Sequence, residues 1–179
     1  QQLTQEGRII HRLRLVHVDI RVSEIRLPPF VDQPVAEELQ RIAPKGIILS
    51  GGPSSVYAEH APLCDPGIWD LGIPVLGVCY GMQLMNYGLG GKVEKKLKRE
   101  DGQFMIDVEE GCALFAEVPA ATAVLLPHGD SVSEVPAGFR VVATSGAIVA
   151  AIECKDRKLY GVQFHPEVDL STHGTKMLG

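Results

Sequence analysis

Gly77-Val78-Cys79-Tyr80-Gly81 stands between two short segments of different type. The apolar run Ile73-Pro74-Val75-Leu76 before it predicts a strand, and Met82-Gln83-Leu84-Met85 after it predicts a helix. A strand, a Gly-x-nucleophile-x-Gly turn and a helix, in this order, form a nucleophile elbow. The flanking glycines let the chain turn sharply, so we expect Cys79 to be exposed at the carboxyl end of its strand. The pattern therefore predicts an α/β protein with a cysteine nucleophile.

A second strand end supplies the partners that a cysteine nucleophile needs. The apolar run 159–164 predicts a strand, and it ends in His165-Pro166-Glu167. A cysteine on an elbow, with a histidine and a carboxylate from another strand end, makes a candidate triad. The elbow pentapeptide alone is a weak signal, because buried structural cysteines are common. The second strand end makes the catalytic interpretation much stronger.

Length and composition indicate a single domain over residues 1–179. The chain is long enough for a substantial core, and 45% hydrophobic with 22% charged residues is ordinary for a globular protein. The net charge of -5 argues against a general nucleic-acid binder. No apolar run approaches the ~20 residues that span a bilayer, and the first residues carry no signal-peptide pattern. We therefore expect a cytoplasmic protein without a membrane partner.

The four cysteines are scattered along the chain, at Cys64, Cys79, Cys112 and Cys154. They form no C-x-x-C pair, which excludes the common zinc spacings and gives no disulfide framework. A reducing compartment fits this pattern, and a catalytic thiol must be free. We expect no metal site in this domain.

The chain alternates strands and helices in its first half and is rich in strands in its second half. Helices are expected over residues 7–14, 35–42 and 68–71. Strands are expected over 16–22 with a continuation to 27, then over 46–49, 73–76, 123–126, 139–143, 148–152 and 159–164, with a hairpin turn at Asp101-Gly102 inside 93–109. The expected fold is α/β, an open, mostly parallel sheet flanked by helices with antiparallel strands added.

Four of the expected strands end in turns that carry chemically useful residues. Open α/β sheets bind their ligands at the carboxyl ends of the strands, so we expect these turns to meet at one site. The four turns are Gly51-Gly52-Pro53, Cys79, His128-Gly129-Asp130 and His165-Pro166-Glu167.

Together these residues resemble the class I glutamine amidotransferases, a family with a flavodoxin-like fold. The matching stretches are 45–56, 74–83, 128–130 and 161–168, and the resemblance runs from about Gly7 to the end of the chain. Within the family, Cys79-Tyr80-Gly81-Met82-Gln83 and His128-Gly129-Asp130 look most similar to the glutaminase domain of GMP synthetases. Residues 57–62 and 98–102 look closer to the eukaryotic form of that branch.

The resemblance implies a role for each residue of the expected site. Cys79 would be the nucleophile, His165 the base, and Glu167 the carboxylate that orients the imidazole. A neighbouring imidazolium or a helix N-terminus favours the thiolate. The resemblance places the oxyanion hole at the backbone N–H groups of Gly52 and Tyr80. It assigns substrate binding to Gly51, Gln83, His128, Gly129 and Asp130, although His128 could equally be structural.

The implied activity is hydrolysis of L-glutamine to glutamate and ammonia. In the GMP synthetase branch the ammonia serves to aminate XMP to GMP in an ATP pyrophosphatase domain or subunit. This chain has no Ser-Gly-Gly-x-Asp-Ser loop, so we expect it to lack that domain. ATP and Mg²⁺ are therefore expected only in the partner, and no cofactor is expected here.

The chain departs from the family pattern in two places. The family begins with a strand that leads into a Gly-x-Gln-Tyr-type turn, and this chain starts inside or after that turn, so we expect the sheet to lack a strand. Pro127 stands where the family carries Ser or Thr, which removes one hydrogen bond from the pocket. Two alternatives stay open: an enzyme of the same fold that serves another pathway, such as a γ-glutamyl hydrolase, and a non-catalytic module that needs a partner.

Overall fold

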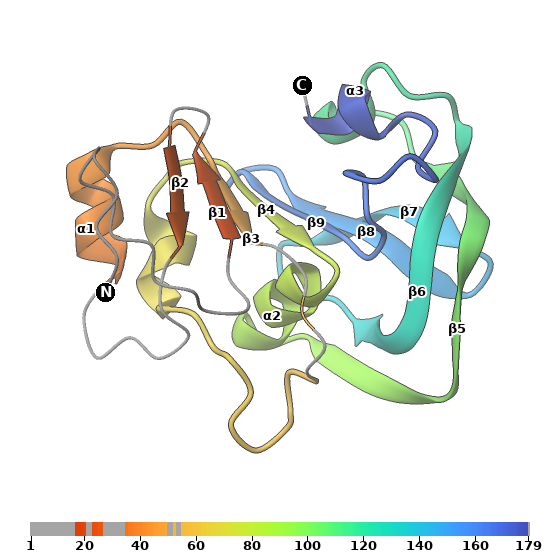
Figure 1. Cartoon of the computed structure of the whole chain (residues 1–179), viewed down its shortest axis with the longest axis horizontal. Helices are drawn as coiled ribbons and strands as arrows, with labels where there is room; N and C mark the ends of the chain where they lie inside the picture. Colours follow the sequence, from red (N-terminus) through yellow and green to blue (C-terminus); the bar gives the residue numbers. More distant parts are fainter. Residues whose placement is uncertain (1–16, 21–22, 27–34, 50–51, 53–54, 179) are drawn as a thin grey trace, which may run out of the picture.

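The structure is a computed structural model that describes residues 17–20, 23–26, 35–49, 52 and 55–178 (Figure 1). The helix expected over residues 7–14 lies outside these ranges. The helix expected over 35–42 is confirmed as α1 (Val35–Ile42), and the one expected over 68–71 overlaps a short 3₁₀ helix, η1 (Pro66–Asp70). The other helices are α2 (Tyr80–Gly88), η2 (Ala113–Phe115) and α3 (Gly174–Leu178).

Seven strands form one mixed sheet in the order β3-β4-β9-β8-β7-β5-β6. The strands β3 (Ile47–Leu49), β4 (Val75–Val78) and β9 (Leu159–Val162) are parallel neighbours. The other four pair antiparallel: β8 (Ile148–Cys154), β7 (Arg140–Ser145), β5 (Lys92–Val108) and β6 (Ala121–Glu134). The expected α/β class, with helices beside parallel strands and antiparallel strands added, is confirmed. The expectation of a mostly parallel sheet is wrong: antiparallel pairings outnumber the parallel ones in the described residues, so the sheet is mixed.

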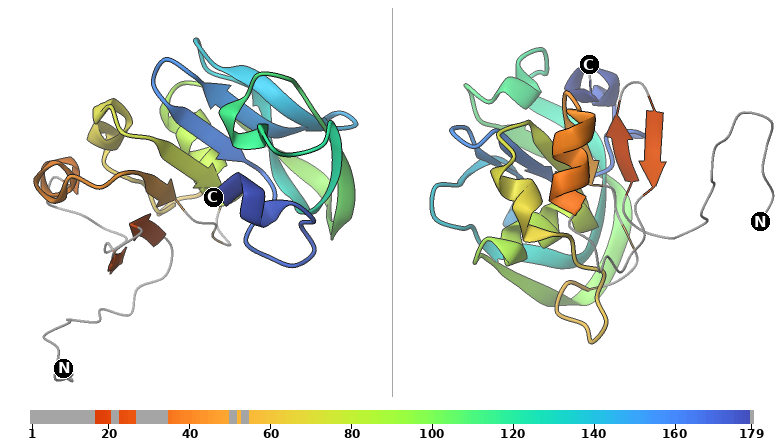
Figure 2. Two further views of the ribbon diagram at one scale, coloured as in Figure 1. Left: turned by 90° about the horizontal axis from the view of Figure 1, so that it is seen from above. Right: turned by 90° about the vertical axis from the view of Figure 1, so that its left-hand side faces the viewer.

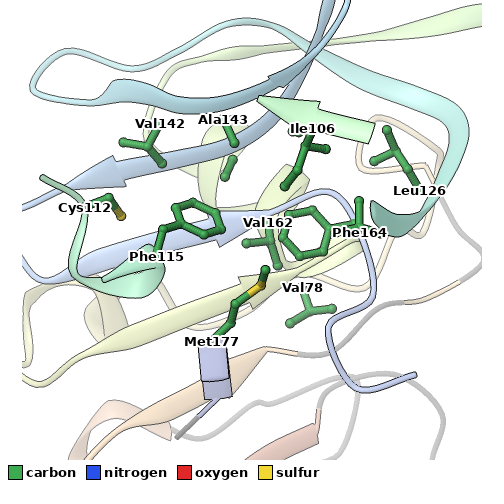
Figure 3. Packing of buried hydrophobic residues seen from close by; sticks show 13 residues of the cluster. Val78, Ile106, Cys112, Phe115, Leu126, Val142, Ala143, Val162, Phe164 and Met177 are labelled. Carbon is green, nitrogen blue, oxygen red and sulfur yellow. The ribbon is translucent and has the colours of Figure 1, made fainter. Parts of the chain in front are cut away.

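The three parallel strands are short and apolar because helices or loops cover both of their faces. On one face, α1, η1 and α2 pack against them through Leu39, Ile68, Trp69, Met85, Ile47, Leu49, Val75 and Leu159. On the other face, Val78 and Val162 join the main core with Phe115, Phe164 and Met177 from η2, the segment after β9, and α3 (Figure 3). Figure 2 shows α1 and η1 side by side, and the Asp65 carboxylate joins them by accepting the Ala36 N–H at 2.9 Å.

The sheet curls until its last strand meets the segment that follows β9 (Figure 1). The outer edge of β6 is not left free, because the Leu125 carbonyl accepts the His165 N–H at 3.0 Å and the Ala123 carbonyl accepts the Thr172 N–H at 3.0 Å. In an antiparallel strand, alternate residues bond to opposite sides, so residue 127 also faces this outer edge. Pro127 therefore removes no hydrogen bond between β5 and β6, which fits the preference of proline for edge strands.

The hairpin expected at Asp101-Gly102 is wrong. Asp101 pairs with Pro127 and Gly102 with Leu126 inside one long strand, β5. The register shifts between Lys95 and Glu100, so the extra residues 96–99 form an irregularity in the strand and not a turn. A local turn preference is small, and the long ladder with β6 outweighs it.

Two further expectations about the strands need correction. His128-Gly129-Asp130 does not form a turn after a strand ending at 126, because β6 continues through it to Glu134. The alternating run expected as one strand over 16–22 and on to 27 contains two strands, β1 (His17–Ile20) and β2 (Ser23–Arg26), which pair antiparallel in a separate sheet. The β1 strand lies beside β3, which is the other edge of the seven-stranded sheet (Figure 1).

Glycine is required where α2 meets β3. A Cβ atom added at Gly81 would lie 2.1 Å from the Leu49 carbonyl oxygen, and one added at Gly77 would lie 2.5 Å from the Gly81 carbonyl carbon and oxygen. These contacts are with backbone atoms, which have little freedom to move. The two glycines of the elbow therefore set how closely the first turn of α2 approaches the ends of β3 and β4.

Replacing Gly81 with alanine should lower the free energy of unfolding by about 3 kcal/mol, because the new methyl group meets backbone in a packed interior. The matched control is Gly88→Ala at the other end of α2, where the nearest atom is Trp69 Nε1 at 3.6 Å. That variant should be neutral or more stable by up to about 1 kcal/mol. Urea unfolding measures both, and equal stability of the two variants would contradict the close approach.

Candidate active site

Cys79 lies on a strained turn at the junction of β4 and α2. Its φ of 53° and ψ of −107° are rare for a residue with a side chain, and it is the N-cap of α2. The Cys79 N–H donates to the Val162 carbonyl at 2.7 Å, and its own carbonyl accepts the N–H groups of Met82 at 3.1 Å and Gln83 at 3.2 Å. Such conformations persist only where the surroundings hold them, and they gather at active sites. The thiol is half-buried at the carboxyl end of β4.

His165 and Glu167 meet beside Cys79, as the sequence predicted for a triad. The His165 Nδ1 and Glu167 Oε1 atoms are 2.7 Å apart. A hydrogen bond with Cys79, and next the one with Glu167, raises the pKa of His165 to about 10. Burial alone would raise the pKa of Glu167, but the hydrogen bond with His165 lowers it below its usual value. His165 is therefore an imidazolium at neutral pH, placed to stabilise a thiolate and to donate a proton.

Tyr80 begins α2, so its N–H is among the first groups of the helix that have no carbonyl partner within it. This is where the sequence predicted one oxyanion donor. The Tyr80 side chain has a structural contact instead: it is buried, and its hydroxyl donates to the Pro62 carbonyl at 2.7 Å. Burial raises the pKa of this hydroxyl to about 12. Gly52, the other predicted donor, is half-buried, and Gly51 lies outside the described residues.

The predicted substrate residues on α2 and β6 are joined by hydrogen bonds. The Gln83 Nε2 atom donates to the Asp130 carbonyl at 2.9 Å and to Gln163 Oε1 at 3.1 Å. The Asp130 carboxylate accepts the Tyr57 hydroxyl at 2.9 Å. Both hydrogens of the Gln83 amide nitrogen are thus used within the protein. Gly129 is half-buried with open space where a side chain would be, and the His128 side chain lies outside the described part.

Gln163 is a site residue that sequence reasoning missed. It is buried at the end of β9, and its Nε2 atom lies 3.7 Å from Cys79 Sγ. The signal was an amide side chain within an otherwise apolar strand, two residues before His165. A buried amide needs partners, so it marks a specific polar contact. Nothing local indicates that one of those partners is the cysteine of the elbow.

Ser171 is a second residue that sequence reasoning missed. Its hydroxyl donates to the His165 carbonyl at 2.5 Å and accepts the Leu125 N–H at 3.1 Å. Since the His165 N–H also bonds to Leu125, the backbone of the histidine is tied to β6 from both sides. Ser171 is buried, with 6% of its surface exposed, so water does not replace these bonds. These hydrogen bonds fix the position of the His165 backbone, from which the imidazole extends toward Cys79.

The residues that the structure describes contain no group of three or more His, Cys, Asp and Glu side chains that could hold a metal ion. None of their helices has the length and apolar character needed to cross a membrane.

Ser171→Ala should slow alkylation of Cys79 by iodoacetamide at pH 7 about tenfold, because His165 loses its anchor and moves from the thiol. Ser171→Thr keeps the hydroxyl and should restore most of the rate. Thr122→Val is the matched control: it also removes a buried hydroxyl from β6, one that bonds to His173 Nδ1 at 2.8 Å. An equal loss of rate in the control would show a general effect of destabilisation.

The raised pKa of His165 has a consequence for stability. Its pKa is raised from 6.5 to about 10, so the folded state binds the proton more tightly than the unfolded state. The stabilisation is full below about pH 6.5 and is lost as the pH rises through about 10. Urea unfolding of wild type and His165→Gln between pH 6 and 10 should show a difference that shrinks with rising pH. The trend should weaken in a Cys79→Ala background, and a difference that grows with pH would contradict it.

Comparison with known proteins places the chain in a family. The family model of "Glutamine amidotransferase class-I" matches residues 5–179. Two similar proteins are named GMP synthase [glutamine-hydrolyzing]. The one from Synechococcus sp. (strain CC9605) is 59% identical over 145 residues, 80% of this chain and 28% of that protein. The one from Thermosynechococcus vestitus is 51% identical over 160 residues, 89% of this chain and 30% of that protein.

This chain thus spans less than a third of the length of these two relatives. Both are cyanobacterial, so the expected likeness to the eukaryotic form stays a prediction. Among solved structures, a putative GMP synthase subunit from Thermoplasma acidophilum superposes with a TM-score of 0.72 at 27% identity, over 85% of this chain and 75% of that one. A glutamine amidotransferase from Thermotoga maritima gives 0.60 at 25% identity, over 83% and 64%. The chain belongs to the class I glutamine amidotransferases.

Proposed function

We propose that this chain is the glutaminase component of a GMP synthase. It hydrolyses L-glutamine to glutamate and ammonia, and the ammonia aminates XMP in a synthetase domain or subunit. The observation that carries the proposal is Cys79 on a strained elbow beside the His165–Glu167 pair. The names of the two cyanobacterial relatives support the use of the ammonia. We also propose that the protein is cytoplasmic, because a free catalytic thiol stays reduced in that compartment.

The first half of the reaction forms a thioester. The Cys79 thiolate attacks the side-chain amide carbon of glutamine, and the backbone N–H groups of Tyr80 and Gly52 stabilise the oxyanion that develops. His165 donates its proton to the nitrogen as the C–N bond breaks, so ammonia leaves. The raised pKa of His165 suits this step, because the imidazole begins protonated at neutral pH.

The second half returns the enzyme to its starting state. The neutral His165 takes a proton from water as the water attacks the thioester carbon. The C–S bond breaks, its electron pair goes to the sulfur, and glutamate leaves. Glu167 holds the imidazole by its Nδ1 atom, so the other ring nitrogen faces the reaction. None of these steps uses a cofactor of this domain, and we assign ATP and Mg²⁺ to the partner.

The test compares two ways of making GMP with the intact protein and its synthetase domain or subunit, XMP, ATP and Mg²⁺. Cys79→Ala should lower glutamine-dependent GMP formation at least ~10³-fold, because a triad nucleophile is lost. GMP formation from added ammonium salt should be unchanged, since it bypasses this site. Cys64→Ala is the control, as burial raises the pKa of the Cys64 thiol to about 12 and makes it a poor nucleophile.

The outcomes separate the alternatives. Full glutamine-dependent activity in Cys79→Ala would overturn the mechanism. Glutamine hydrolysis by the wild type without GMP formation from either nitrogen source would favour an enzyme of the same fold in another pathway. The absence of any glutamine hydrolysis, with ammonium-dependent GMP formation intact, would favour a non-catalytic module.

A further inference from the structure

The Gln163 side chain stands between two groups of the site that come from different elements. It is 2% exposed, and its backbone N–H is held by the Ala150 carbonyl at 2.8 Å. Its Oε1 atom accepts a hydrogen bond from Gln83 at 3.1 Å, and its Nε2 atom lies 3.7 Å from Cys79 Sγ. Hydrogen bonds to sulfur are longer than those to oxygen because the sulfur atom is larger. No other side chain of β9 or its extension before His165 reaches Cys79 among the hydrogen bonds of the described residues.

The orientation of this amide follows from the groups behind it. The Asp130 carbonyl can only accept, so the nitrogen end of the Gln83 amide must face it, at 2.9 Å. The same nitrogen then has its second hydrogen for Gln163, which must present its oxygen. The nitrogen end of the Gln163 amide is left to face the sulfur. One backbone carbonyl of β6, that of Asp130, thus sets the donor and acceptor ends of the Gln83 and Gln163 amides.

We propose that Gln163 is a catalytic residue that donates a hydrogen bond to the Cys79 sulfur and, with Gln83 and the Asp130 carbonyl behind it, holds that sulfur in its reactive position. The proposal rests on Cys79 being the nucleophile of the proposed function. It also gives Gln83 a role other than the substrate contact that the resemblance implied: Gln83 orients Gln163.

The neutral Gln163 amide complements His165, which is the charged hydrogen-bond donor beside Cys79. His165 faces Cys79 with Glu167 behind it, and the first turn of α2 contributes no acidic residue. His165 gives up its proton when ammonia leaves, whereas the Gln163 amide keeps its hydrogens throughout. When the thioester is hydrolysed, the electron pair of the C–S bond returns to sulfur, and the Gln163 N–H stabilises that developing thiolate. A donor at the sulfur favours the anionic form over the neutral thiol.

The experiment measures the rate of Cys79 alkylation by iodoacetamide against pH in the intact protein, with peptide mapping to separate Cys79 from the other cysteines. Gln163→Met removes the donor at similar length. We expect the midpoint of the profile to move up by about 0.5 to 1 pH unit, and the rate at pH 7 to fall about three- to tenfold, as for a lost hydrogen bond to a charged group. The plateau at high pH should not change.

Gln163→Glu is the second variant, because it keeps the size of the side chain and the bond from Gln83. It places a carboxylate oxygen against the sulfur, so its midpoint should move further up than that of Gln163→Met. Gln103→Met is the matched control: it makes the same replacement on β5, at a glutamine whose Nε2 atom donates to the Leu170 carbonyl at 2.8 Å and not to the Cys79 sulfur. Its profile should be that of the wild type.

Unchanged midpoints in both folded Gln163 variants would overturn the role of Gln163. This result is distinct from a failure of the proposed function, which would appear as no glutamine hydrolysis by the wild type. If Gln163→Met does not fold, the pH midpoint of the alkylation profile of Gln163→Glu decides alone. A higher midpoint supports the proposal, and an unchanged midpoint contradicts it. A merely structural role of Gln163 would lower stability without moving the midpoint.

Discussion

The hydrogen bond from the Cys79 N–H to the Val162 carbonyl joins the ends of two parallel strands, and the site depends on it. It helps to hold the positive φ of Cys79, which turns the chain from β4 into α2. It also brings the residues that follow β9 against the nucleophile, first Gln163 and then His165. The two glycines of the elbow make this geometry accessible, because side chains at Gly77 or Gly81 would collide with backbone.

The curl of the sheet supplies the second support. The extension of β9 that carries His165 is a loop, and loops rarely hold a side chain rigidly. Here the outer edge of β6 binds the loop through Leu125 and Ala123, and Ser171 completes the attachment. The strand furthest from β3 in the order of the sheet therefore positions the base of the triad. The same strand carries Asp130, whose carbonyl orients Gln83 and through it Gln163.

Sequence reasoning succeeded where structure is local and failed where distant pairing decides. The elbow, α1 and the short apolar strands β3, β4 and β9 follow from residue periodicity and from glycine spacing, and the structure confirms them. The expected turns at Asp101-Gly102 and at 128–130 were wrong, because the long ladder of β5 with β6 holds both segments extended. The contacts of Gln163 and Ser171 could not be predicted, since their partners come from other elements of the chain.

Selective labelling of Cys79 tests the central claim most directly. Burial raises the pKa of Cys64 to about 12 and that of Cys112 to about 11, and Cys154 is buried. A general electrophile should therefore react mainly with Cys79. The glutamine analogue 6-diazo-5-oxo-L-norleucine requires a formed pocket as well as a reactive thiol. Intact mass and peptide mapping after treatment should show a single adduct, on Cys79, that excess L-glutamine prevents. No adduct on the folded protein, or an adduct on another cysteine, would contradict the account.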